Sequence, residues 1–250
     1  MGRSILMEVC VDSVQSAITA QAAGAQRVEL CDNLVEGGTT PSAGMIQICR
    51  QHLSIGLHVL IRPRRGDFLY SDLEFEVMRH DIQIAKEMGT DGVVLGVLLP
   101  EGNIDVVRTR ELISLARPMS VTFHRAFDLT PDPFRALDDL LQLQVDRLLT
   151  SGQQPTAPEG AELISALCQK AGENLSVLPG GGINEDNLKA LLEQTGVTEF
   201  HASAREFAPS KMTFRREEVP MGGSPLTTEY GSMTASQTRI ARLLDLARQT

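Results

Sequence analysis

The sequence has no tryptophan and only two tyrosines, and its basic residues are outnumbered by acidic ones. It holds 23 lysines and arginines against 32 aspartates and glutamates, which gives a net charge of −9. Proteins that bind nucleic acids neutralise phosphates with clustered cations and stack bases on aromatic rings. The composition therefore argues against a nucleic-acid partner.

Long apolar runs and paired cysteine motifs are also lacking. Glu8 interrupts the first apolar run well short of the roughly 7–15 residues of a secretion signal. No stretch approaches the ~20 apolar residues of a membrane span. The four cysteines, Cys10, Cys31, Cys49 and Cys168, form no Cys-x-x-Cys pair, so we expect no structural zinc site. We predict a cytoplasmic protein with reduced thiols and no membrane association.

Short apolar segments alternate with amphipathic segments along the whole chain. The apolar segments are predicted as strands at 5–11, 26–32, 57–63, 92–98, 119–125, 145–151, 175–180 and 197–203. Helical segments lie between them, and the last helix, Ser236–Arg248, has apolar residues at helical spacing. Eight strand–helix units, with no GxGxxG turn after the first strand, favour a closed barrel over a doubly wound open sheet. We predict an α/β fold, a (β/α)₈ TIM barrel that forms a single domain over residues 1–250.

One connection is longer than the others. Residues 207–235 contain three prolines and three glycines together with several serines and threonines. This composition is typical of a surface loop. Because the segment follows the eighth strand, we predict that it lies over the C-terminal mouth of the barrel, where lids are found.

Alternation along the strands predicts which side chains point into the barrel, because the outer face packs beneath helices and must be apolar. In the first strand this alternation places Glu8 and Cys10 inside. In the second strand it places Arg27, Glu29 and Cys31 inside. The two strands thus carry the same Glu-x-Cys pattern on their inner faces.

Further ionisable side chains are predicted inside the barrel on later strands, namely Arg62, His124 and His201. One interpretation is a Glu–Arg network that satisfies itself. Because these residues gather at the C-terminal ends of strands, where barrel active sites lie, we favour a catalytic or binding pocket. Arg62 would clamp a carboxylate or phosphate. His124 would act as general acid or base with Glu8 or Glu29 as its partner.

A glycine run follows the seventh predicted strand. Gly180, Gly181 and Gly182 precede a predicted helix, and Ser203 and Arg205 end the eighth strand. Glycine lets backbone N–H groups approach an anion closely, and barrels often hold phosphate between these two loops. We predict that these five residues bind a phosphate or carboxylate; the alternative is a turn without a ligand.

The cysteines divide into two classes. Cys49 and Cys168 lie in predicted helices and fit the usual role of a small apolar residue. Cys10 and Cys31 lie on neighbouring strands, so both sulfurs can reach one rim of the barrel. Two thiolates at one place suit a soft ion such as Cu(I).

Long and specific motifs run from the first predicted strand to the eighth. They are MEVCVDS (7–13), VELCDNLVEGGTTPS (28–42), IRPRRGDFLYSD (61–72), VTFHRAFD (121–128), LLTSGQ (148–153), LPGGGI (178–183) and EFHASA (199–204). With these motifs the chain resembles the CutC family of copper homeostasis proteins. The resemblance implies a cytosolic TIM barrel that forms a homodimer, with Cu(I) ligands at the positions of Cys10 and Cys31.

Two functions therefore stand as hypotheses. In the first, the protein binds Cu(I) through Cys10 and Cys31. In the second, it is an enzyme, such as a lyase, isomerase or aldolase, that acts on a small phosphorylated or carboxylated metabolite. The arginine-rich motifs around Arg62 and His124 favour an anionic organic ligand. No lysine lies at a clear strand end, so we expect acid–base chemistry by Glu and His in place of a Schiff base.

Overall fold

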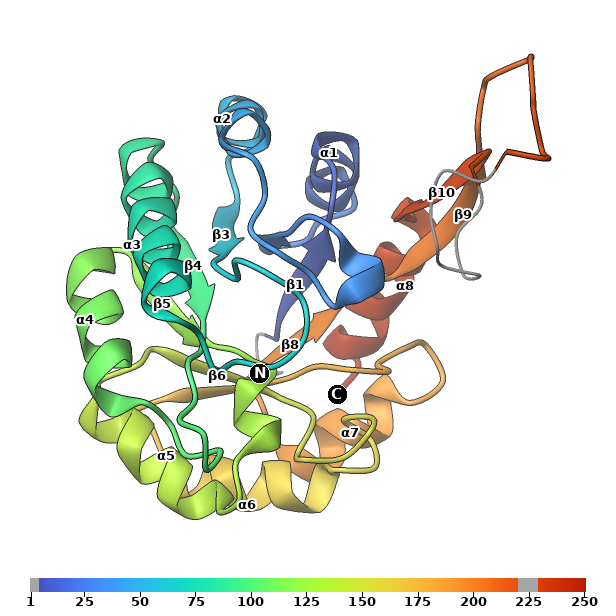
Figure 1. Cartoon of the computed structure of the whole chain (residues 1–250). Coiled ribbons are helices and arrows are strands. Elements are labelled where there is room, and N and C mark those ends of the chain that lie inside the picture. The colour runs from blue at the N-terminus through green and yellow to red at the C-terminus, as the bar shows by residue number, and fades with distance from the viewer. Residues whose placement is uncertain (1–4, 220–228) are drawn as a thin grey trace.

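Eight parallel strands form the centre of the structure, a computed structural model that describes residues 5–219 and 229–250. Their bounds are β1 Leu6–Val11, β2 Arg27–Leu30, β3 Gly56–Leu60, β4 Gly92–Leu95, β5 Ser120–Phe123, β6 Arg147–Thr150, β7 Ser176–Pro179 and β8 Glu199–Ala202. Each strand from β1 to β6 pairs with the next in sequence, and β1 pairs with both β2 and β8. A parallel bridge between Gly180 and His201 joins β7 to β8. The predicted TIM barrel is confirmed (Figure 1).

Helices surround the strands on the outside (Figure 1). They are α1 Val14–Ala22, α2 Ala43–His52, α3 Asp72–Glu87, α4 Val106–Ala116, α5 Pro133–Gln142, α6 Ala161–Ala171, α7 Leu188–Thr195 and α8 Gln237–Arg248, with 3₁₀ turns η1 Leu34–Glu36 and η2 Arg125–Leu129. Side-chain oxygens of Ser13, Ser42 and Ser71 accept hydrogen bonds from the first turns of α1, α2 and α3. None of the helices in the described residues is long and apolar enough to cross a membrane.

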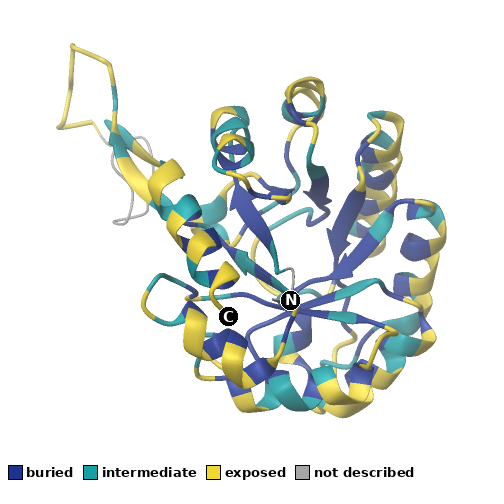
Figure 2. Ribbon diagram, turned by 180° about the vertical axis from the view of Figure 1, so that it is seen from behind, coloured by how far each residue is buried: buried dark blue, intermediate teal, exposed yellow. Residues whose placement is uncertain are grey.

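Two separate apolar clusters follow from the alternation of strand side chains. Met7, Val9 and Val28 are fully buried in the large core between strands and helices. Cys10 and Cys31 belong to a smaller cluster with Leu60 and Val94. Figure 2 shows buried residues along the strands and on the inner faces of the helices. The small cluster lies inside the barrel, beside its mouth.

The connection after β8 begins and ends in strands. β9 Arg205–Pro209 and β10 Gly231–Ala235 pair antiparallel as a ribbon. In the described residues this ribbon projects outward beside α1 and does not cross the mouth (Figure 1). The amide of Ala235 donates to the Ser16 hydroxyl, which ties the base of the ribbon to α1. Residues 220–228 of the predicted loop lie outside the described residues.

Candidate functional site

The structure brings the two predicted metal-ligating thiols together at the carboxyl ends of β1 and β2. The Sγ atoms of Cys10 and Cys31 are 3.7 Å apart. The strand register places Cys10 opposite Glu29, and the Cys10 thiol lies 3.2 Å from a Glu29 carboxylate oxygen. All three side chains are buried. The Glu-x-Cys pattern on two adjacent parallel strands thus becomes one cluster of four side chains, in which Glu8 lies below the other three.

These residues fit a thiophilic metal ion. In the described chain, ligand atoms of Cys10, Glu29 and Cys31 all lie within 4.8 Å of one another. Metal–thiolate bonds of about 2.3 Å, as in zinc sites, place two sulfurs on one ion ~3.8 Å apart at a tetrahedral angle. The observed spacing of 3.7 Å therefore needs little rearrangement. Thiolate sulfur is the donor that soft Cu(I) prefers, whereas the Glu29 oxygen is a hard donor.

His201 on β8 belongs to the same cluster. Its Nδ1 lies 2.8 Å from Glu8 Oε1, and its Nε2 lies 3.7 Å from Glu29 Oε2. The imidazole and the Cys10 sulfur also line the same pocket. Carboxylate, imidazole and thiol follow one another in the order found in activated nucleophiles. Strand alternation predicts that His201 lies inside the barrel but does not indicate a role for it.

The neighbouring groups shift the pKa values of the two thiols in opposite directions. The hydrogen bond from Cys31, together with His201, lowers the pKa of Cys10 to about 5 against the effect of burial. Burial and the neighbouring Cys10 raise the pKa of Cys31 well above its usual range. Burial also opposes a charged His201, but hydrogen bonds with Cys10 and Glu8 outweigh it and raise the pKa of that imidazole. At neutral pH a Cys10 thiolate therefore faces a His201 imidazolium, and Cys31 keeps its proton.

We expect iodoacetamide to alkylate Cys10 with an apparent pKa of about 5, far below the ~8.5 of a free thiol, because the thiolate is the reacting form. The thiolate should persist as the pH rises above this value. Replacement His201→Gln should move the profile to higher pH, whereas His52→Gln in α2 should leave it unchanged. Mass spectrometry of the alkylated peptide measures the profile. A wild-type profile centred near ~8.5 contradicts this assignment.

Glu8 lies below the thiols in a buried ionic network. The Arg27 guanidinium donates to both Glu8 and Glu199, and Arg147 reaches Glu199 at 3.1 Å. Although burial opposes the charge of Glu8, Arg27 and His201 outweigh it and hold the pKa of this carboxyl well below its usual range. Glu8 is therefore a carboxylate that pairs with Arg27 and orients His201. Burial and the charge of Cys10 have the opposite effect on Glu29, whose pKa is raised well above its usual range.

Arg62 holds the connections that cover Cys31. Its Nη1 donates to the carbonyl of Gly38 at 2.7 Å, and its Nη2 donates to the carbonyl of Gly66 at 2.8 Å. A Cβ on Gly38 would lie 3.5 Å from Cys31 Sγ and 2.7 Å from Leu60 Cδ2, so this connection packs directly over the sulfur. The Nη groups of Arg62 thus serve backbone carbonyls, while its buried Nε has no partner in the described residues.

His124 lies with Arg62 around a different side chain, Phe68. Its ring centre is 4.8 Å from that of Phe68, and the Arg62 guanidinium is 5.0 Å from the same ring. His124 Nδ1 accepts from the amide of Ala126. Burial, aided by Arg62, lowers the pKa of His124 to about 3, so the imidazole is neutral. The four predicted catalytic residues therefore fall into two groups, Glu8 with Glu29 and Arg62 with His124.

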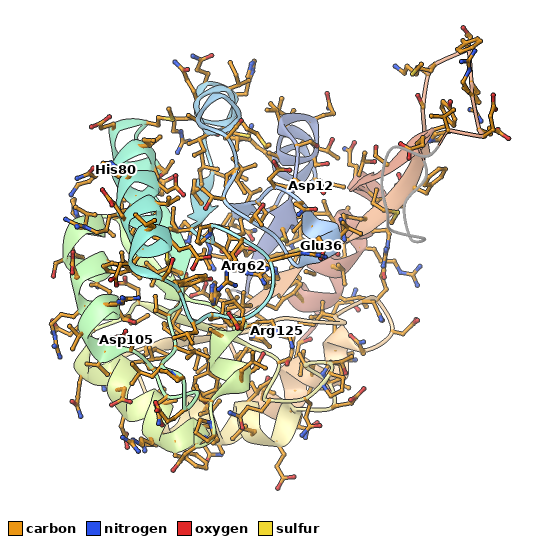
Figure 3. The ribbon with its side chains drawn as sticks, viewed as in Figure 1. Asp12, Glu36, Arg62, His80, Asp105 and Arg125 are labelled. Atoms are coloured by element: carbon orange, nitrogen blue, oxygen red, sulfur yellow. The ribbon has the colours of Figure 1, made fainter. Side chains whose placement is uncertain are left out.

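A pocket of about 350 Å³ opens beside Cys10 at the mouth of the barrel. Its lining is Cys10, Leu34, Arg125, Leu149, Gly180, Gly181, Gly182, Ile183, His201, Ala202, Ser203 and Arg205. All five predicted anion-binding residues are in this lining. Arg125, which belongs to the VTFHRAFD motif, is a further lining residue that the glycine run and the end of the eighth strand do not predict. Arg62 and Arg125 both lie near the centre of the view in Figure 3, where the connections after β3 and β5 meet.

The comparisons with known proteins agree with these motifs. The sequence model of the CutC family matches residues 5–206. The chain belongs to the CutC family. A copper homeostasis protein cutC homolog of Mus musculus is 49% identical over 99% of this chain and 91% of its own length. A family protein CutC of Chromobacterium violaceum is 51% identical over 95% of this chain and 96% of its own length.

A crystal structure of a CutC copper homeostasis protein from Streptococcus agalactiae has a TM-score of 0.76 and 36% identity. It covers 80% of this CutC chain and 98% of the streptococcal one. Thiamine phosphate pyrophosphorylase from Pyrococcus furiosus has a TM-score of 0.61 at 16% identity and covers 99% of this chain and 97% of its own. The second likeness shows the barrel fold alone.

Proposed function

We propose that this CutC protein binds one Cu(I) ion between Cys10 and Cys31 and acts in copper homeostasis in the cytoplasm. The observation that carries the proposal is the pair of buried sulfurs 3.7 Å apart at the ends of adjacent strands. Thiolates select Cu(I) over hard cations. The printed names of the mouse and human relatives, which refer to copper homeostasis, support the same function.

The residues around the sulfurs suit capture of a cation. Cys10 offers a thiolate at neutral pH, and Cys31 must lose its proton to become the second ligand. Two thiolates bound to one Cu(I) ion leave a net negative charge. The imidazolium of His201 and the buried carboxyl of Glu29 are nearby groups that can donate hydrogen bonds to it. The segment over Gly38, held by Arg62, keeps water away from the Cys31 side.

An anaerobic titration of reduced protein with Cu(I) against a competing chelator tests this function. We expect one equivalent of copper to be withheld from the chelator. A protein with Cys49→Ser and Cys168→Ser should behave identically, because these cysteines lie in α2 and α6 outside the site. Complete transfer of copper to a weak chelator contradicts the proposal.

A second candidate function is an acid–base enzyme acting on a small carboxylated or phosphorylated metabolite. The pocket beside Cys10, with Arg125, Arg205 and the glycine run in its wall, favours it. Its proposed catalytic and anchoring residues, Glu8, Glu29, Arg62 and His124, lie outside the lining of this pocket. Conversion of such a metabolite by copper-free protein would support this candidate.

We also propose a homodimer in which the β9–β10 ribbon contacts a second copy. Phe207, Met212, Phe214 and Met233 expose apolar surface on or next to the ribbon. The double substitution Phe207→Ser and Phe214→Ser should convert a dimer into a monomer in sedimentation velocity. Replacement Val107→Ser, on exposed α4, should leave the dimer intact. A monomeric wild-type protein contradicts this proposal.

A further inference from the structure

The described residues offer Cu(I) only two soft ligands. The ligand atoms that lie within 4.8 Å of one another come from Cys10, Cys31 and Glu29, and the third of these is a hard carboxylate oxygen. His201 is not part of this set, and its Nδ1 is occupied by Glu8. A third soft ligand would therefore come from a molecule outside the chain.

The pocket reaches the metal-binding cluster from one side only. Cys10 and His201 line it, whereas Cys31 does not and is covered by the segment over Gly38. A molecule that enters the pocket thus meets the cluster at the Cys10 sulfur. Its volume of about 350 Å³ lies at the small end of the range for ligand pockets.

The wall of the pocket away from Cys10 carries cationic groups that can bind an anion. Arg125 is fixed by Asp128 at 2.7 Å and by Ser151 at 2.6 Å, and its Nη1 lies 3.2 Å from the position that a Cβ on Gly181 would take. Arg125 remains 42% exposed. The backbone of Gly181 and Gly182 forms part of the same wall. Arg205 adds a second cation, which reaches Asp12 only at 3.6 Å.

We propose that the pocket binds a small thiol that carries a carboxylate, and that this thiol is the third ligand of the Cu(I) ion. Its sulfur would bind the ion beside Cys10, and its carboxylate would bind Arg125 and Arg205. This inference rests on the proposed Cu(I) site. It goes beyond it by naming the chemical class of the molecule that the pocket takes.

Transfer of copper from a complex with two such thiolates to the protein needs no oxidant. A copper complex with two such thiolates enters, and the Cys10 thiolate and Cys31 each form a bond to the ion. One of the incoming thiolates leaves with the proton that Cys31 loses, and the other stays in the pocket. Copper remains Cu(I) throughout, and copper, sulfurs and protons together carry a charge of −2 on both sides, to which the two carboxylates add a further −2 on each side.

Equilibrium dialysis of Cu(I)-loaded protein against radiolabelled 3-mercaptopropionate tests the proposal. We expect one molecule retained per copper. 2-Mercaptoethanol, which has a thiol but no carboxylate, should bind about tenfold or more weakly, because charge-assisted hydrogen bonds contribute roughly 1.5–3 kcal/mol. Copper-free protein should retain less 3-mercaptopropionate than the loaded protein.

Variants locate the binding to the pocket. The double substitution Arg125→Gln and Arg205→Gln should abolish the preference for 3-mercaptopropionate and leave the copper stoichiometry at one. Replacement Arg79→Gln, on the outer face of α3, should change neither. Equal retention of the two thiols by loaded wild-type protein overturns this inference and leaves the Cu(I) site standing. Failure to load copper at all overturns the proposed function itself.

Discussion

Replacement of both Cys10 and Cys31 by serine is expected to weaken Cu(I) binding by about 10⁴-fold. Structural zinc sites with four ligands bind with roughly 10–16 kcal/mol, or about 3 kcal/mol per ligand, and each 1.4 kcal/mol is a factor of ten. Serine keeps the size of the side chain but supplies a hard oxygen that does not ionise at neutral pH. The buried pair would then hold no soft ligand in the described residues.

The single substitutions show how much of this loss of Cu(I) affinity each cysteine accounts for. Cys10→Ser and Cys31→Ser should each weaken binding by about 10²-fold if the two sulfurs hold the same ion. Competition against a series of chelators of graded affinity measures all three values. An affinity that is unchanged in the double variant would show that copper binds elsewhere, and it would contradict the assignment.

Replacement Arg27→Met is expected to lower the free energy of unfolding by about 3–5 kcal/mol. Arg27 is the cation shared by the buried carboxylates of Glu8 and Glu199. Without it Glu8 keeps only the imidazole of His201 and the more distant His58, and Glu199 keeps only Arg147, so two buried carboxylates share fewer cations. Methionine fills a similar volume, so the loss reports the charge and not a cavity.

Urea denaturation at neutral pH measures this effect, with Arg79→Met as the matched control. Arg79 pairs with Glu111 on the exposed outer faces of α3 and α4, where an ion pair contributes about 0–1 kcal/mol. Because the folded-state pKa of Glu8 is lowered, its stabilisation is present above about pH 4.3 and is lost as the pH falls. The difference between wild type and Arg27→Met should shrink in acid. A loss no larger than that of Arg79→Met would contradict the role of the network.

For the first two strands the sequence was sufficient to predict which residues point inward. Glu8, Cys10, Glu29 and Cys31 alternate with fully buried apolar neighbours, and a period of two leaves no other assignment when helices cover the outer face. Parallel pairing of adjacent strands then brings the two cysteines together. This part of the site depends on local pattern alone.

The rest of the site depends on contacts between segments far apart in the chain. His201 meets Cys10 only because closure of the barrel places β8 beside β1. Arg62 has the sequence character of an anion clamp, but the paths of two connections bring backbone carbonyls to its Nη groups. Arg125 enters the pocket because Asp128 and Ser151 fix its guanidinium. Neither periodicity nor spacing encodes these tertiary contacts.

The central claim is that Cys10 and Cys31 bind one Cu(I) ion together. X-ray absorption at the copper K edge, on protein loaded anaerobically with one equivalent, tests it most directly. The account predicts sulfur neighbours around copper that are lost in the Cys10→Ser and Cys31→Ser double variant. A copper environment made only of nitrogen and oxygen, identical in wild type and variant, would contradict it.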